Sequence, residues 1–136
     1  MIAFLDANVL IYLLEGEEQF ARRVRATLNE IIEAYPGIGT GLSRLSWLEC
    51  RVGPMKSGDL ALIKKYDDFF ARPDLTWIDL TKTVVEIAAE IRARTGLKTP
   101  DCLQAACCLQ IGKGHVFVTG DAAFKRVHGL TVRLLR

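Results

Sequence analysis

Short runs of apolar residues alternate along the chain with longer segments in which apolar residues recur every three or four positions. The short runs predict buried β-strands, and the longer segments predict amphipathic helices. The expected strands are Ile2–Leu5, Ile38–Thr40, Leu75–Ile78, Val116–Val118 and Leu130–Leu134. The expected helices are Val9–Leu14, Glu17–Ala34, a segment from Ser43 through Cys50, Leu60–Phe70, a segment from Thr83 to Gly96, Thr99 to about Gly112, and a short turn at Asp121–Phe124.

Glycine, proline and capping residues indicate where these elements begin and end. The segment Gly53–Gly58 contains Gly-Pro and Ser-Gly pairs, which predict a loop because both pairs disfavour a continuing helix. Thr83 and Glu86 stand at capping-box spacing, so a helix is expected to begin at Thr83. Thr99 followed by Pro100 predicts another capped helix start.

The alternation of strands and helices predicts an α/β fold, in which about five short strands form a central, mostly parallel sheet flanked by helices. With 136 residues, the chain fits a single domain covering residues 1–136. Ligands of such sheets bind beyond the carboxyl ends of the strands, where the strand order reverses. Asp6 follows the first strand and Asp121 follows Val116–Val118, so both carboxylates should lie at this end. Each acid also has a simpler alternative role as a helix cap.

Composition and charge narrow the class of protein without identifying it. Half of the residues are hydrophobic, and the formal charge of +2 is too small to indicate nucleic-acid binding by itself. No acid follows Asp121, whereas four basic residues do, which fits either a positive rim around an acidic centre or an ordinary solvated face. The four cysteines lack zinc-ligand spacing and are expected to be buried hydrophobes. No signal peptide or membrane-spanning run is present, so a cytoplasmic protein without membrane contact is expected.

Glu49 and Asp101 lie on expected helices and require separate arguments. Glu49 is flanked by Trp47, Leu48 and Cys50, an apolar setting in which an ionised group needs compensation, although a narrow exposed face is an alternative. Asp101 lies in the first turn of its helix, where the helix N-terminus stabilises a carboxylate by typically ~0.3–1 kcal/mol. A purely structural role for Asp101 therefore stays open.

Four acids at one end of a sheet repel one another and raise one another's pKa values unless a cation neutralises them. Hard oxygen ligands without a nearby cysteine or histidine suit Mg²⁺ or Mn²⁺ rather than zinc. Such a site binds phosphate oxygens and activates water, so phosphodiester hydrolysis is the expected reaction class. The chain has neither a G-x-x-x-x-G-K-[ST] nor a G-x-S-x-G motif. His115 and His128 lack an obvious nucleophile partner and are expected at the surface or in loops.

Four motifs, in this order, resemble those of the PIN-domain nucleases and, within them, the VapC toxins of bacterial toxin–antitoxin pairs. Phe4–Leu10 is similar to the family's opening strand with its first acid, and Ser43–Glu49 to its serine-containing helix with a glutamate. Pro100–Ala106 is similar to the aspartate that opens an alanine-rich helix. Thr119–Phe124, leading to Gly129–Leu130, resembles the C-terminal signature. Each motif alone is weak, but the four together are specific and cover essentially the whole chain.

The resemblance implies a PIN fold, Mg²⁺ or Mn²⁺ dependence, endoribonuclease activity through metal-activated water, homodimerisation, and inhibition by a cognate VapB-type antitoxin. Carried over by position, the catalytic and metal-binding residues are Asp6, Glu49, Asp101 and Asp121. Asn8 and Thr119 are then polar neighbours that orient carboxylates or metal-bound water, and Ser46 either does the same or faces solvent. Some relatives place a further acid where Ala123 stands, so a second metal would be held weakly or only with substrate bound.

Contact with an RNA substrate is expected from basic residues around the acids, because phosphate contacts dominate nucleic-acid affinity. Lys125 and Arg126 are the first candidates, followed by Arg44. No base-specific reader is evident, so the sequence does not predict the target RNA.

Three alternatives stay open. A phosphoacceptor receiver module would need an acidic pair near the first strand and a phosphorylatable aspartate after a middle strand, which Asp6 and Asp79 match poorly. A PIN-like domain that binds RNA without cutting is disfavoured by the presence of all four acids. A housekeeping RNA-processing nuclease is the main rival to a toxin, and the small size of the chain favours the toxin.

Overall fold

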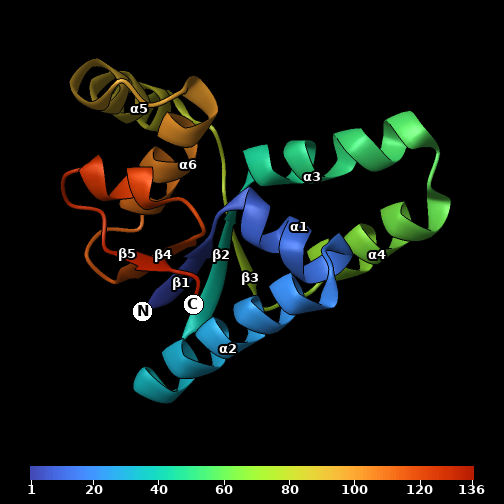
Figure 1. The fold of residues 1–136 in the computed structure, drawn as a ribbon. Coiled ribbons are helices and arrows are strands. Elements are labelled where there is room, and N and C mark those ends of the chain that lie inside the picture. Colours follow the sequence, from blue (N-terminus) through green and yellow to red (C-terminus); the bar gives the residue numbers. More distant parts are fainter.

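The computed structural model describes all residues 1–136 and shows a parallel five-stranded sheet with helices on both faces (Figure 1). The strands are β1 (Ile2–Leu5), β2 (Gly39–Ser43), β3 (Leu75–Ile78), β4 (His115–Thr119) and β5 (Val132–Leu134). The helices are α1 (Ala7–Glu15), α2 (Glu18–Ala34), α3 (Arg44–Ser57), α4 (Leu60–Phe70), α5 (Lys82–Thr95), α6 (Thr99–Leu109) and the 3₁₀ helix η1 (Ala122–Arg126). The predicted α/β class, with about five short and mostly parallel strands, is confirmed.

Strands β1 and β4 lie side by side at the centre of the sheet, whose order is β3-β2-β1-β4-β5. Every neighbouring pair is parallel, and Phe4 of β1 stands opposite Gly41 of β2 and Phe117 of β4. The chain first builds outward from β1 to β3 and then crosses to β4 and β5 on the other side. The strand order therefore reverses between β1 and β4, which is where ligand sites form in sheets of this kind.

Two apolar layers cover the sheet, one on each face, because successive side chains of a strand point to opposite faces. Ala3 and Leu5 belong to the layer formed with α1, α2, α3 and α4. Phe4 belongs to the layer formed with α5, α6 and η1, where its ring stacks on Phe117 at a centroid distance of 5.7 Å. The four cysteines are buried within these layers without disulfides, as expected of small hydrophobic residues.

Helix α3 differs from the prediction, because it continues through the expected loop at Gly53–Gly58. Its buried residues are Ser46, Cys50 and Pro54, which follow one another at four-residue intervals and keep one face of the helix against the protein. Burial of that face compensates for the missing hydrogen bond at Pro54. The helix ends at Gly58, which has a φ of 68°, in the left-handed region that favours glycine.

Two helix starts and one histidine also differ from the predictions. Thr81, rather than Thr83, caps α5, since its side chain accepts a hydrogen bond from the N–H of Val84. Helix α6 begins at Thr99 without a side-chain cap, and it ends at Leu109 rather than near Gly112. His115 is buried in β4, whereas His128 is exposed as expected.

The imidazole of His115 replaces missing backbone partners, which explains its burial. Its Nδ1 donates to the carbonyl of Gly112, and its Nε2 accepts a hydrogen bond of 3.1 Å from the N–H of Thr131. Both ring nitrogens are therefore satisfied inside the fold. The residue is structural and not a free base for chemistry.

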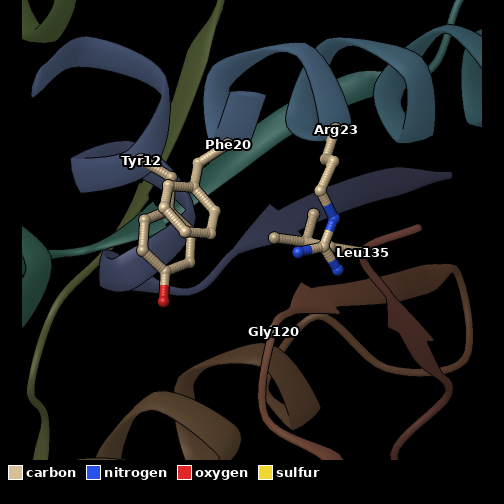
Figure 2. Close-up of a pocket in the computed structure, with 5 residues that line it drawn as sticks. All are labelled: Tyr12, Phe20, Arg23, Gly120 and Leu135. Carbon is tan, nitrogen blue, oxygen red and sulfur yellow. The ribbon is translucent and has the colours of Figure 1, made fainter. Parts of the chain in front are cut away.

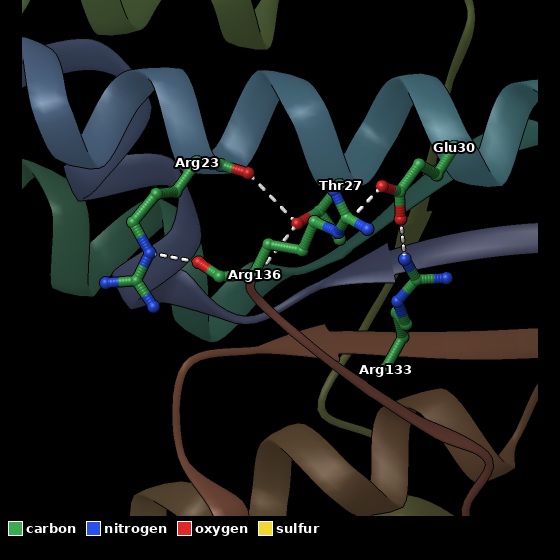
Figure 3. A network of polar contacts seen from close by, with 5 residues as sticks. All are labelled: Arg23, Thr27, Glu30, Arg133 and Arg136. Atoms are coloured by element: carbon green, nitrogen blue, oxygen red, sulfur yellow. Dashed lines mark hydrogen bonds and ion pairs between the residues drawn. The ribbon is translucent and has the colours of Figure 1, made fainter.

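Residues at the end of the chain are fastened to helix α2 by a polar network (Figure 3). Glu30 accepts ion pairs from Arg133 and from Arg136. The N–H of Arg136 donates to Thr27 Oγ1 at 3.1 Å, and Arg23 donates to the carbonyl oxygen of Arg136. This network holds the segment after β5 beside the carboxyl end of β4. None of the helices has both the length and the apolar character needed to cross a membrane.

Candidate functional site

Asp6 lies at the end of β1, buried at the point where the strand order reverses. Its N–H donates to the carbonyl of Val118 at 3.0 Å, and its Oδ2 accepts a hydrogen bond of 2.8 Å from Thr119 Oγ1. The side chain makes no capping hydrogen bond to helix α1, although Asp6 stands at the capping position. Capping therefore does not explain why an aspartate is buried here.

The electrostatic state of Asp6 follows from this burial. Burial raises the pKa of its carboxyl, the hydrogen bond from Thr119 lowers it, and the charges of Asp101 and Glu49 raise it. Together these effects bring the pKa from 3.8 to about 7. Three of the four predicted acids thus lie near enough to influence one another, and two of them come from helices on opposite faces of the sheet.

Glu49 is held by a chain of buried hydrogen bonds that runs between α3 and α6. Gln104 Nε2 donates to Glu49 Oε1 at 3.0 Å and to Ser46 Oγ at 2.9 Å, while its Oε1 accepts from Ser43 Oγ at 2.8 Å. Burial raises the pKa of Glu49, the bond from Gln104 lowers it, and the charge of Asp101 raises it. Ser46 is fully buried rather than facing solvent.

Gln104 is the residue of this site that sequence reasoning missed. The one signal that could have found it is a long polar side chain in a helix otherwise rich in alanine and cysteine, three residues after Asp101 and hence on the same face. From the sequence, Ser43 is predicted only to cap a helix. It does cap α3, through a 3.1 Å bond from the N–H of Ser46, and it also fixes the orientation of the Gln104 amide.

Asp101 and Asp121 complete the acidic set from α6 and from the loop after β4. Burial raises the pKa of Asp101, the charge of Asp121 raises it further, and Lys98 lowers it. Asp121 is exposed, and its Oδ1 accepts a 2.8 Å hydrogen bond from the N–H of Ala123. Asp121 therefore caps η1, which is the alternative role that its sequence position allowed. Its own N–H donates to Thr119 Oγ1 at 3.1 Å.

The donor set fits a hard divalent cation in its chemistry. None of the four acids takes part in any ion pair of the chain, although the charge of Lys98 acts on Asp101 from a greater distance. Asn8 Oδ1 is a buried oxygen without a hydrogen-bond partner. Carboxylate and amide oxygens are the ligands that Mg²⁺ and Mn²⁺ prefer. However, no three acidic, histidine or cysteine side chains are gathered closely enough to hold one ion as they stand.

The basic residues expected at the rim differ in how free they are. Lys125 and Arg126 are exposed on η1, directly after Asp121. Arg126 donates a long hydrogen bond of 3.4 Å to the carbonyl of Thr95. Arg44 is already engaged, because it pairs with Asp79 at 3.2 Å and lies over the ring of Trp77 at 4.4 Å.

Comparison with protein-family models matches residues 3–130 to the PIN domain. A search of curated proteins finds no significant match. Among solved structures, VapBC2 from Rickettsia felis bound to a promoter DNA fragment gives a TM-score of 0.78 at 19% identity, over 100% of both chains. FitAcB from Neisseria gonorrhoeae gives 0.70 at 21% identity, over 97% of this chain and 96% of that one. A toxin–antitoxin complex from Klebsiella pneumoniae gives 0.67 at 23% identity, over 95% of each. At such identities the likeness establishes the fold.

Proposed function

The chain belongs to the PIN-domain family, and from this premise we propose that it is a metal-dependent endoribonuclease, the toxin of a VapBC-type pair. The observation that carries the proposal is the burial of the Asp6 carboxyl near other acids and without an ion-pair partner. Its carboxyl is buried beside the charges of Asp101 and Glu49, and it forms no ion pair. A cation is the component that would stabilise the ionised form of such a carboxylate.

The four acids would hold one or more Mg²⁺ or Mn²⁺ ions, with Asn8 offering a further oxygen. A bound cation of this kind neutralises phosphate charge and lowers the pKa of water. The chain's own contribution is orientation. Thr119 holds Asp6 through a hydrogen bond to Oδ2, and Gln104 holds Glu49 through a hydrogen bond to Oε1. Neither bond involves the second oxygen of its carboxylate.

We further propose a VapB-type antitoxin as a partner, because the similar solved structures include VapBC and other toxin–antitoxin complexes. A second copy of the chain is the other proposed partner, for which the surface of α3 is the support. Helix α3 exposes a stripe of large apolar side chains, which are Trp47, Leu48, Val52 and Met55. Exposed apolar stripes mark surfaces that a partner covers. We assign this stripe to the homodimer, so Leu48→Glu should convert a dimer into a monomer in light-scattering measurements.

Two experiments test the proposed function. Purified protein is incubated with an end-labelled RNA and a DNA of the same sequence, with Mg²⁺ and with a chelator. Internal cleavage of RNA only, and only with Mg²⁺, is expected, whereas equal cleavage of DNA would contradict the assignment to RNA. In cells, expression of the chain should arrest growth, and Asp6→Asn should not. Continued growth with the wild-type chain would contradict a toxin while leaving a processing nuclease in place.

A further inference from the structure

A small hollow opens between α1, α2 and the loop after β4 (Figure 2). It is lined by Tyr12, Phe20, Arg23, Gly120 and Leu135. The rings of Tyr12 and Phe20 overlap at one side, with centroids 5.3 Å apart and planes inclined by 21°. The guanidinium of Arg23 lies at the other side, above the loop that contains Gly120.

The tight turn between α1 and α2 brings the two rings together. Gly16 forms this turn, and a Cβ there would lie 2.6 Å from the carbonyl oxygen of Tyr12, which only glycine avoids. Phe20 and Arg23 are three residues apart on α2 and therefore share one face. Arg23 is fixed through its Nε, which donates to the carbonyl of Arg136, while its two terminal nitrogens have no partner in the chain.

Two walls of the hollow are formed by segments that carry acids of the site. Gly120 stands between Thr119 and Asp121, and α1 begins directly after Asp6. A Cβ at Gly120 would be in van der Waals contact with Tyr12 Cε2, at 3.6 Å, so the loop lies directly against the edge of the ring. A substrate strand whose phosphate reached the acids would therefore place a neighbouring nucleotide at this hollow.

The size and chemistry of the hollow limit what it can take. Its volume is about 80 Å³, far below the roughly 300–1,000 Å³ typical of pockets that enclose a small molecule. It suits one planar ring held at the surface rather than an enclosed ligand. An aromatic stack next to a guanidinium with free terminal nitrogens is the combination that holds single-stranded nucleic acid, through base stacking and phosphate contact.

We infer that this hollow is a nucleotide subsite for the RNA strand: a base stacks on Tyr12, and Arg23 contacts the adjoining phosphate. This inference rests on the proposed ribonuclease function and adds a positioning element that reads no particular base. A side chain of a protein partner is the competing occupant. RNA is favoured because the hollow combines aromatic rings with a guanidinium and is lined by Gly120, which stands between Thr119 and Asp121.

The test compares RNA binding by four proteins, all carrying Asp6→Asn so that cleavage does not interfere. They are the parent, Tyr12→Leu, Arg23→Gln and the matched control Arg22→Gln, which removes an exposed charge from the same helix outside the hollow. Each is titrated with fluorescein-labelled single-stranded RNA and with a series of the same RNA carrying one abasic position in turn. Circular dichroism melting confirms that each variant is folded.

Tyr12→Leu should weaken binding by roughly 5- to 150-fold, the equivalent of about 1–3 kcal/mol for one stacked base. Arg23→Gln should lower the slope of log affinity against log salt by the amount expected for about one phosphate contact. Arg22→Gln should change this slope less. One abasic position should weaken the parent as much as Tyr12→Leu does and leave Tyr12→Leu unaffected, a pattern that loss of packing alone cannot produce.

Wild-type protein that cuts RNA, with Tyr12→Leu and Arg23→Gln binding it as tightly as Arg22→Gln does, would overturn the subsite alone. Unchanged RNA binding by Tyr12→Leu and Arg23→Gln, together with weaker binding of a protein partner by the same variants, would also overturn the subsite. The hollow would then be assigned to a side chain of that partner. A wild-type chain that neither binds nor cuts RNA would overturn the subsite together with the proposed function.

Discussion

The hydroxyl of Thr119 donates a 2.8 Å hydrogen bond to Asp6 Oδ2, although the two residues are 113 positions apart in the sequence. The hydroxyl oxygen of Thr119 in turn accepts a 3.1 Å hydrogen bond from the N–H of Asp121. One side chain at the end of β4 therefore joins the acid that ends β1 to the acid that follows β4.

Thr119→Val should shift the pH profile of RNA cleavage. The hydrogen bond from Thr119 lowers the pKa of Asp6, so its loss raises that pKa and moves the acidic limb of the profile to higher pH. The free energy of unfolding should fall by about 1–2 kcal/mol because a buried carboxylate oxygen loses its donor. Thr119→Ser keeps the hydroxyl and should leave the profile in place. A profile unchanged by Thr119→Val would show that Asp6 ionisation does not control the rate.

Asp6→Asn should stabilise the metal-free protein, increasingly so as the pH rises. The pKa of Asp6 is about 7 in the fold against 3.8 as its ordinary value, so the folded state holds the proton better. Binding of this proton stabilises the wild-type fold fully below about pH 4. The stabilisation of the wild type falls as the pH rises and is lost above about pH 7. Asparagine has no proton to lose and avoids this loss, which amounts to a few kcal/mol.

Urea unfolding of both proteins in chelator, from pH 4.5 to 8, measures this difference. Asp74→Asn is the control, because Asp74 is exposed and its pKa is lowered by Arg72. The free energy of unfolding of Asp74→Asn, relative to that of the wild type, should not increase as the pH rises. Parallel curves for Asp6→Asn and the wild type would contradict a raised pKa at Asp6.

Gln104→Leu should weaken both the fold and the response to Mg²⁺. The substitution removes the partner of Ser43, Ser46 and Glu49 in a buried setting, which should cost about 1–3 kcal/mol of unfolding free energy. With Glu49 no longer oriented, half-maximal cleavage should require roughly 10- to 100-fold more Mg²⁺. Gln110→Leu, an exposed position at the end of the same helix, is the control. An unchanged Mg²⁺ requirement would assign Gln104 to packing only.

Much of the fold follows from the sequence because the central strands β1 and β4 are almost entirely buried and contain continuous apolar runs. Asp6 and Asp121 could be placed from their strand ends alone, since parallel strands bring those ends together. Gln104 could not, because its role depends on Ser43 and Glu49, which reach it only through tertiary packing. The same reason accounts for Pro54 within α3 and for His115 inside the sheet. In both cases burial overrides a local preference.

The double variant Lys125→Ala with Arg126→Ala should bind RNA more weakly and with a flatter salt dependence. Each lost phosphate contact on a single strand lowers the slope of log affinity against log salt by about 0.7. Arg44→Gln should have a smaller effect, because Arg44 is already engaged by Asp79 and Trp77. Fluorescence titrations across a salt series measure the slopes. An unchanged slope for the double variant would place the RNA path elsewhere on the surface.

The initial rate of RNA cleavage against Mg²⁺ concentration, for the wild type, Asp6→Asn and Asp101→Asn, tests the four-acid site most directly. Both variants should keep the circular dichroism spectrum of the wild type and cut no faster than the wild type does in chelator. Asp68→Asn changes an exposed acid on α4 outside the set and should cut at the wild-type rate. A folded Asp6→Asn or Asp101→Asn variant that retained Mg²⁺-dependent cleavage would contradict the account.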